Sequence, residues 1–361
     1  MNIDGRRIVI VCGSGGVGKT TVAASIAVSL ARSGRRTVVM AVDPARRLAT
    51  SLRLPRTPGG RSTIDVGGGT RLTALLLDTK RTFDELIERH AGSAQRRDRI
   101  FANPFYQRIA GTLSGTHEYM AMERLYDLAT EEDWEAVVID TPPTRSALAF
   151  LDAPTRMTDF LGGRMFRWLL WPYRRAGGAG MRGMNLGARA LASTVGRVLG
   201  SEALRDIAEF LAAFEGMYAG FKERAARVYD LLSEEQTGFV VVTAPEAASL
   251  REAGYFIDRL GSADMNLAGV VINRWRRAPS PHASARAIES LENEGPEGRA
   301  AAACLGLAER LRALEARGRA AVDPFIAAHP GVDLTFVPEL PVDVHDREGL
   351  DAIAGHVFGS S

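Results

Sequence analysis

The segment from residue 13 to residue 20, GSGGVGKT, constrains the fold of this 361-residue chain more than any other feature. An apolar run from Arg7 to Cys12 precedes it and predicts a buried strand, and a helix is predicted from Thr20 to Arg32. The spacing G-x-x-x-x-G-K-[ST] between a strand and a helix is typical of a loop that binds phosphates. A chance glycine-rich turn is the alternative, and the flanking strand and helix argue against it.

Each part of this loop has a predicted role toward Mg-ATP. The glycines let backbone N–H groups turn inward around the phosphates, and the following helix adds the positive end of its dipole. Lys19 contacts the β- and γ-phosphates, the Thr20 hydroxyl ligates Mg²⁺, and Thr21 reaches the α-phosphate. The predicted nucleotide-binding residues of the loop are Gly13, Ser14, Gly15, Gly16, Val17, Gly18, Lys19, Thr20 and Thr21.

Short apolar runs recur along the chain and alternate with helical patterns. They predict further strands at 37–42, 136–139, 238–242, 268–272 and 334–337. Such alternation indicates an α/β fold of the P-loop type, with a mostly parallel sheet and helices on both faces. Ligands of such sheets bind beyond the carboxyl ends of the strands, which is where the loop at 13–20 is expected to lie.

Three segments interrupt this alternation. Residues 55–69 are rich in Gly and Pro and predict a loop. Residues 154–235 have a helical pattern without a convincing strand, so they predict a helical subdomain inserted between two parts of an ATPase core, 1–153 and 236–361. A polar, proline-containing linker is expected at about 278–298. A helix, predicted from Arg299 to Arg319, then precedes the last strand.

Two carboxylates are expected to face the nucleotide from strand ends. Asp140 follows the run Val137–Ile139 and is predicted to lie on the Mg²⁺ side, and the rigid segment Thr141–Thr144 after it fits a loop that senses the γ-phosphate. Asp43 ends the second strand, where it can orient or deprotonate the attacking water. Asp43 before Pro44 is also suited to capping a helix, and the two roles are compatible.

Composition argues against several other classes of protein. A formal net charge of +2 gives no general attraction to nucleic acid. The two cysteines, Cys12 and Cys304, cannot build a disulfide framework or a zinc knuckle within one chain. No stretch approaches the roughly 18 apolar residues of a membrane-spanning helix, and the N-terminus does not resemble a signal peptide. We therefore expect a soluble cytoplasmic protein.

Three motifs together resemble the arsenite-pump and tail-anchored-protein-targeting ATPases, a family of deviant P-loop dimers. They are Gly13–Thr21, Asp43–Ala45 and Asp140–Thr144. The match extends to Leu77-Asp78, Glu118, Met120, Val271-Ile272-Asn273 and the closing Val337-Pro338-Glu339-Leu340-Pro341. The resemblance implies a dimeric ATPase in which Asp43 faces the water and Asp140 begins the second switch. It also implies that Asn273 and the loop at Pro338 hold adenine.

The chain departs from this family in two respects. The family carries a lysine where this chain has Ser14, and that lysine reaches the phosphates of the opposite subunit. A bacterial branch without the intermolecular lysine is implied, either with slow hydrolysis or with a cation from Arg145 or from a paralogous chain. The family's clustered thiols cannot be built from Cys12 and Cys304, and this disfavours binding of arsenite, a soft ligand.

The predicted insertion carries two apolar stretches. Large apolar residues mix with Gly between Trp168 and Leu186, and this segment either binds an apolar client helix or packs within the subdomain. The later stripe, from Phe210 to Phe221, is expected to pack internally.

The favoured function is a nucleotide-driven chaperone or targeting factor, acting as a homodimer or with a paralogous chain. Its expected partners are ATP, ADP and an apolar helix or membrane protein, with no nucleic acid. A metalloid- or anion-pump subunit and a partition-type spatial regulator are the alternatives. The segment Arg347–Ser361 is short and not basic, which disfavours the partition-type role.

Overall fold

A computed structural model describes most of the chain. The described residues are 1, 3, 5–42, 48, 52, 60–109, 116–130, 133–142, 202, 206–207, 209–210, 213, 217–278, 284–341, 343–344 and 347–359. Several residues of the predicted site lie outside this part, namely Asp43, Pro44, Ala45, Pro143, Thr144 and Arg145. The segment from Trp168 to Leu186, predicted to bind a client, also lies outside it.

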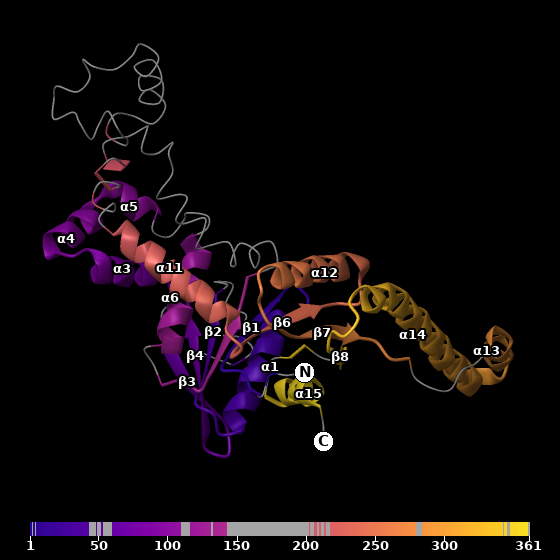
Figure 1. Ribbon diagram of the computed structural model, residues 1–361. Helices are drawn as coiled ribbons and strands as arrows, with labels where there is room; N and C mark the ends of the chain where they lie inside the picture. Colours follow the sequence, from indigo (N-terminus) through magenta and orange to yellow (C-terminus); the bar gives the residue numbers. More distant parts are fainter. Residues whose placement is uncertain are drawn as a thin grey trace, which may run out of the picture.

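An eight-stranded sheet forms the centre of the described structure, in the order β3-β4-β2-β5-β1-β6-β7-β8 (Figure 1). The strands are β1 Ile8–Gly13, β2 Thr37–Ala41, β3 Arg61–Gly67, β4 Thr70–Leu76, β5 Ala136–Asp140, β6 Thr237–Thr243, β7 Leu267–Trp275 and β8 Leu334–Pro338. Every neighbouring pair is parallel except β3 and β4, which form an antiparallel hairpin. The predicted α/β fold, mostly parallel, is confirmed.

Helices cover both faces of this sheet. The helices of the described part are α1 Lys19–Arg32, α3 Thr79–His90, α4 Ala94–Ala102, α5 Pro104–Ile109, α6 Thr116–Thr130, α11 Tyr218–Ser233, α12 Ala247–Ser262, α13 Ala285–Glu292, α14 Gly295–Ala328 and α15 Arg347–Phe358. The side chains of β1 alternate between two cores: Val9 and Val11 pack with α1 and α15, and Ile8 and Ile10 pack with α3, α6, α11 and α12. Because both faces are covered, the central strands β1, β2, β5 and β6 are buried along their whole length and consist mainly of apolar residues.

The loop predicted at 55–69 is wrong over its second half. Arg61–Gly67 is the edge strand β3, and its side chains alternate between exposed and partly buried positions. The glycines at 67–69 all have positive φ and form the turn into β4. An edge strand buries little of its side-chain surface, so it needs few apolar residues and its period-two pattern is weak. The prolines before β3 and the glycines after it therefore make the segment resemble a loop.

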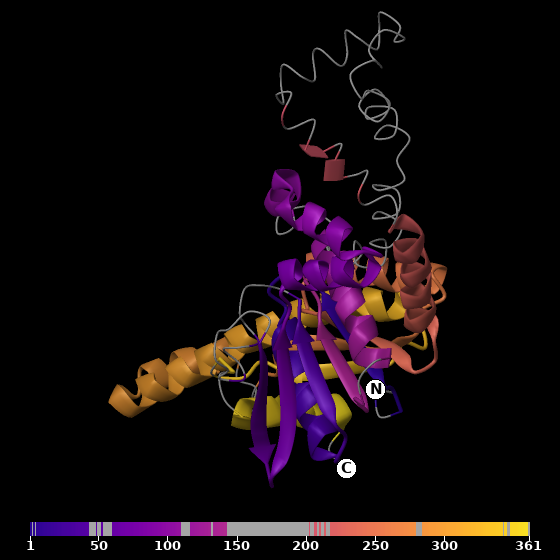
Figure 2. The same ribbon diagram turned by 90° about the vertical axis from the view of Figure 1, so that its left-hand side faces the viewer.

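Helices α3 to α6 and the N-terminal part of α11 gather at one corner of the molecule (Figures 1 and 2). Helices α3, α4 and α5 are not among the predicted elements, although α3 and α4 begin at polar caps. Asp78 Oδ1 accepts a hydrogen bond from Arg81 N at 3.0 Å, and Ser93 Oγ accepts one from Arg96 N at 3.3 Å. Phe210 stacks on Tyr106 of α5 with ring centroids 6.0 Å apart, and it is buried, as expected for internal packing.

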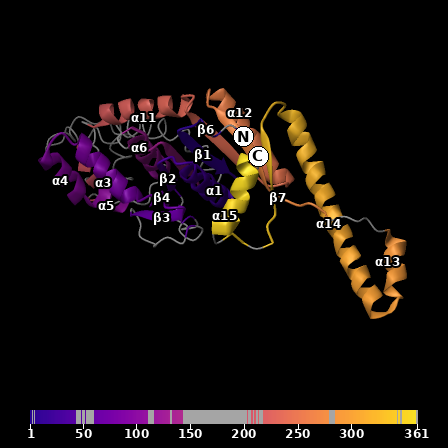
Figure 3. The ribbon, with the colours of Figure 1, turned by 90° about the horizontal axis from the view of Figure 1, so that it is seen from below.

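The linker predicted at 278–298 is mostly helical. Ser284 caps α13, and α14 begins at Gly295 and runs for 34 residues, well beyond the predicted Arg299–Arg319. Pro296 lies in the first turn of α14, where the backbone N–H that proline lacks would have no partner within the helix. This proline therefore favours the start of a helix and does not indicate a linker. Figures 1 and 3 show α14 and α13 extending away from the sheet. Neither α14 nor any other helix in the described ranges is both long and apolar enough to span a membrane.

Candidate nucleotide site at the carboxyl ends of the strands

The loop between β1 and α1 requires glycine at two positions. Gly13 has φ +147°, and a Cβ there would stand 2.0 Å from the carbonyl oxygen of Val242 in β6. Gly18 has φ +96°, and a Cβ there would stand 2.2 Å from Nδ2 of Asn273. The loop is therefore pressed against the ends of β6 and β7. Any side chain at either glycine would displace it.

The first turn of α1 is open to an anion. Gly18 precedes the helix with no side-chain cap, and residues 19–22, all described, include no acidic residue. The backbone N–H groups at this end therefore keep their partial positive charge. Thr20 and Thr21 are half-buried in this turn, at the positions predicted for contact with Mg²⁺ and the α-phosphate.

Lys19 is folded back onto the loop. Its side chain is 7% exposed, and Nζ donates a hydrogen bond to the carbonyl oxygen of Ser14 at 2.8 Å. The ammonium group therefore lies across the loop, where phosphate oxygens can replace the carbonyl as its acceptor. Ser14 is buried too, and its Oγ makes no hydrogen bond within the described part of the chain.

The ends of β1, β2 and β5 are bound together beside this loop. Thr141 donates two hydrogen bonds to the carbonyl oxygen of Val11, from N at 3.1 Å and from Oγ1 at 2.9 Å. Val42 N donates to the carbonyl oxygen of Asp140 at 3.0 Å. Asp140, only 2% exposed, is thus held level with the end of β1. Asp43 follows Val42 in the chain and lies outside the described residues.

His117 is a residue of this region that the sequence analysis missed. It stands in the first turn of α6, next to Glu118, and its ring lies between two other elements. Nε2 lies 2.6 Å from the carbonyl oxygen of Val42, and Nδ1 lies 2.5 Å from Oγ1 of Thr79 at the start of α3. Glu118, which belongs to the family resemblance, could have indicated His117, because the two residues are neighbours in the first turn of α6.

Asn273 supports the loop from the end of β7. It is buried, and its Nδ2 donates a hydrogen bond to the carbonyl oxygen of Val17 at 2.8 Å. Pro338 ends β8 opposite Trp275 of β7, and Glu339 N donates to the Trp275 carbonyl oxygen at 2.9 Å. The two residues predicted to hold adenine therefore come from neighbouring strand ends, on one side of the loop. Their contact with adenine stays a prediction.

A buried ion network joins α6 to α11 behind these strand ends. Arg224 of α11 pairs with Glu123 at 2.5 Å and also with Asp127, and both carboxylates belong to α6. Arg89 of α3 forms two hydrogen bonds with Asp127, at 2.8 and 2.9 Å. Burial raises the pKa of the Glu123 carboxyl, against the opposing effect of hydrogen bonds from Tyr119 and Arg224. Arg224 therefore opposes the effect of burial on the pKa of Glu123.

The two cysteines lie apart in the fold. Cys12 is fully buried in β1, where burial raises the pKa of its thiol, and Cys304 is exposed on α14. Within the ranges that the structure describes, no cluster of three or more His, Cys, Asp or Glu side chains is arranged to hold a metal ion.

The sheet is mostly parallel, and its first strand leads through a glycine-constrained loop into a helix, with a buried lysine at the junction. This arrangement defines a P-loop nucleotide hydrolase. The chain belongs to the anion-transporting ATPase family, whose sequence profile matches residues 6–291. It is therefore an ATPase, and the predicted resemblance to the arsenite-pump and tail-anchored-protein-targeting ATPases is confirmed.

Named relatives agree with this assignment. The "ATPase ARSA2" of Chlamydomonas reinhardtii is 30% identical over 268 residues, covering 74% of this chain and 67% of the relative. The "ATPase GET3" of Malassezia globosa is 32% identical over 143 residues, covering 40% of this chain and 41% of the relative. The "ATPase get3" of Pyrenophora tritici-repentis is 25% identical over 277 residues, covering 74% of this chain and 73% of the relative.

Proposed function

We propose that this ATPase binds Mg-ATP at the loop 13–21 and uses Lys19 and Asp43 for hydrolysis. The observation that carries the proposal is the placement of Lys19, buried at the start of an uncapped helix with its ammonium on the loop's own carbonyl. Lys19 would exchange that carbonyl for β- and γ-phosphate oxygens and neutralise the charge that develops there. Asp43 would orient the attacking water and accept its proton.

The residues around the loop fit a magnesium ion. Asp140 is a buried carboxylate level with the loop, and Thr20 is a hydroxyl in the first turn of α1, which are oxygen donors of the kind Mg²⁺ prefers. When bound, the ion would neutralise phosphate charge. Asn273 and the loop at Pro338 are proposed to hold adenine, with Asn273 also supporting the loop through Val17.

We infer that the state of the nucleotide site reaches the helical region through α6. One end of α6 contacts Val42 through His117, and its middle is paired to α11 through Glu123 and Arg224. A movement at the strand end after Val42 would therefore shift α6 and α11 together. In a dimer, this would open and close a surface for an apolar helix, which is the work of a chaperone or targeting factor.

Two other roles have less support. A partition-type regulator would need a free basic amphipathic tail. Here α15 packs on α1 instead, with Leu350, Ile353 and Val357 buried. A metalloid-pump role would need a thiol cluster, which Cys12 and Cys304 do not form. A pump for an anion without thiol ligands is the alternative that the family's description favours.

The test is to trap the ATP-bound state. Asp43→Asn removes water activation and leaves the phosphate loop intact, so it should bind ATP and Mg²⁺ with near-normal affinity and lose hydrolysis. Sedimentation of this variant with ATP should show dimers, and affinity purification should retain proteins with exposed apolar helices. Loss of ATP affinity with an unchanged rate per bound ATP would make Asp43 a structural cap. Monomers at all concentrations would contradict the dimer.

A further inference from the structure

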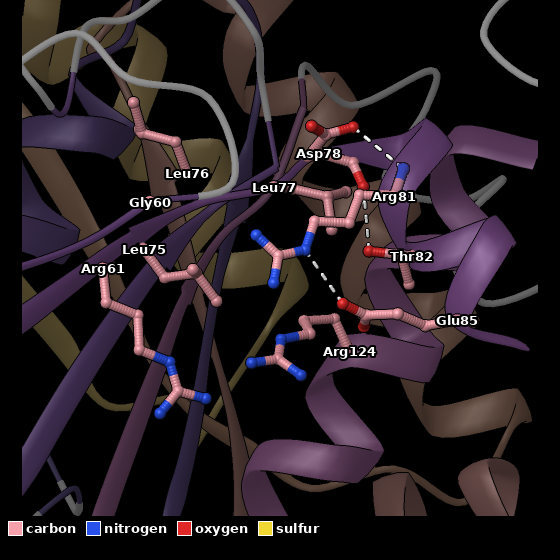
Figure 4. Close-up of a pocket in the computed structure, with 10 residues that line it drawn as sticks. All are labelled: Gly60, Arg61, Leu75, Leu76, Leu77, Asp78, Arg81, Thr82, Glu85 and Arg124. Carbon is pink, nitrogen blue, oxygen red and sulfur yellow. Dashed lines mark hydrogen bonds and ion pairs between the residues drawn. The ribbon is translucent and has the colours of Figure 1, made fainter.

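Two features of the described structure lie outside the proposed nucleotide site. One is a cavity of about 370 Å³ beside β3, α3 and α6, where Asp78, Arg81, Thr82 and Glu85 bond to one another (Figure 4). The other is an arm formed by α13 and the N-terminal half of α14, which projects from the sheet (Figures 1 and 3). These polar groups of the cavity are engaged within the chain, whereas the arm exposes apolar side chains.

A stripe of apolar and small residues runs along α14. Its members recur in steps of four and three residues, which keeps them on one face of the helix in the pattern by which two helices pack together. The stripe consists of Ala300, Cys304, Leu307, Leu311, Leu314, Gly318, Ala321 and Phe325. We call its first part, from Ala300 to Leu314, the seam.

The two parts of this stripe differ in what covers them. Near the sheet, Gly318 is buried, and a Cβ there would stand 3.6 Å from the ring of Trp275 in β7. On the arm, Leu307 is 58% exposed and Leu314 is 37% exposed, and Cys304 is exposed as well. The stripe is therefore continuous in the sequence, but the described part of the chain covers only the part next to the sheet.

Helix α13 packs on the other side of the arm. Gly298 and Ala302 are buried there, and a Cβ at Gly298 would stand 2.2 Å from the carbonyl oxygen of Leu291 in α13. Ala300 and Cys304 each follow one of these buried residues by two positions, which is about 200° around an α-helix. The seam therefore faces away from α13.

The two ends of the arm carry opposite charge. At the tip, residues 287–298 include no lysine or arginine, and the exposed glutamates are Glu289, Glu294 and Glu297. At the base, residues 309–319, Arg310 and Arg317 are exposed and form no ion pair within the described ranges. The other arginines of the base pair along the helix, Arg312 with Glu309 and Arg319 with Glu315. The arm is thus acidic at its tip and basic at its base.

We propose that the seam packs against the seam of a second copy of this chain, with the two arms antiparallel. Antiparallel pairing brings each acidic tip beside the basic base of the other arm, whereas parallel pairing would bring like charges together. It also keeps the two sheets apart, because each sheet lies at the base of its own arm. In the register that buries the most leucine, Leu307 faces the partner's Leu311 and Cys304 faces the partner's Leu314.

This contact goes beyond the dimer proposed above, because it involves no residue of the nucleotide site. The seam is about 20 Å long, so the contact is weak and depends on protein concentration.

Disulfide crosslinking of the full chain with diamide, without nucleotide, tests the arrangement. Leu314→Cys should form a disulfide-linked dimer at least about tenfold faster than the wild type, because pairing holds the new thiol opposite the partner's Cys304. The wild type should crosslink slowly, since its two Cys304 side chains would lie about 15 Å apart along the arms and Cys12 is buried. Adding Cys304→Ser to Leu314→Cys should remove the gain.

Ala313→Cys is the matched control, because Ala313 is exposed, precedes Leu314 directly and lies off the seam. It should crosslink no faster than the wild type. Adding Leu307→Glu to Leu314→Cys should abolish the gain, while adding Ile326→Glu, at an exposed apolar residue of α14 outside the stripe, should preserve it. Fast crosslinking of the wild type through Cys304 would mean parallel arms, and equal rates for Leu314→Cys and Ala313→Cys would mean no contact at the seam. Either result would overturn the proposal.

Discussion

Nε2 of His117 lies 2.6 Å from the carbonyl oxygen of Val42, the residue immediately before Asp43. A carbonyl can only accept a hydrogen bond, so Nε2 must carry a proton. In the neutral ring, Nδ1 then accepts from the Thr79 hydroxyl at 2.5 Å. One imidazole thus fixes the end of β2 against the start of α3, directly beside the segment proposed to activate water.

His117→Ala should lower kcat about tenfold, with KM for ATP changed less than about twofold. A partly buried hydrogen bond is worth about 1–1.5 kcal/mol, and this one holds Val42, the residue before Asp43, away from the proposed phosphate contacts. His117→Gln should recover most of the rate, since its amide can donate to the Val42 carbonyl. His356→Ala, at an exposed histidine of α15, serves as the control. Steady-state kinetics would contradict this role if His117→Ala changed KM alone, or if His117→Gln were as slow as His117→Ala.

The phosphate loop and the parallel sheet could be predicted because their signals are local. The glycines, Lys19 and Thr20 stand in one short segment, and the buried strands are nearly pure apolar runs. His117 could not be predicted, because its role depends on Val42 and Thr79, which only the tertiary fold brings to it. The hydrogen bond from Asn273 to Val17 could not be predicted either, because it joins residues more than half of the chain apart.

Ser14→Lys should raise the rate of ATP hydrolysis at least about tenfold, and only at protein concentrations that allow dimers. A cation that enters the opposite subunit's site, closed to water, stabilises the transferring phosphoryl group by several kcal/mol. Ser14→Met supplies a side chain of similar length without charge and should not raise the rate. Rates measured across a range of protein concentrations check this. A gain that does not depend on concentration would contradict dimer-dependent activation.

Arg224→Met should lower the free energy of unfolding by about 3–5 kcal/mol, because it leaves Glu123 and Asp127 buried with less positive charge. Arg227→Met is the control, since Arg227 lies one turn along α11 in an exposed pair with Glu223. It should cost less than about 1 kcal/mol. Urea unfolding of both variants measures the difference. Similar losses for the two would mean that the network contributes little.

Neither arsenite nor antimonite should stimulate ATP hydrolysis. Cys12 is buried in β1 and Cys304 is exposed on α14, so the two thiols of one chain do not form a metalloid site. Hydrolysis rates with and without the metalloid test this point. Severalfold stimulation that disappears in Cys304→Ser would instead support a metalloid-pump role.

The central claim is that Lys19 at the start of α1 holds the phosphates of ATP during hydrolysis. The most direct measurement compares ATP hydrolysis and ATP affinity in the wild type, Lys19→Ala and Lys80→Ala. Lys80 is an exposed lysine paired with Asp84 at 2.7 Å, so its removal controls for the loss of one charge. We expect Lys19→Ala to reduce kcat by 10³ or more, on the order of the effect of other cations on a transferring phosphoryl group, and to weaken binding greatly. Lys80→Ala should match the wild type. Near-normal turnover in Lys19→Ala would contradict the assignment of this site.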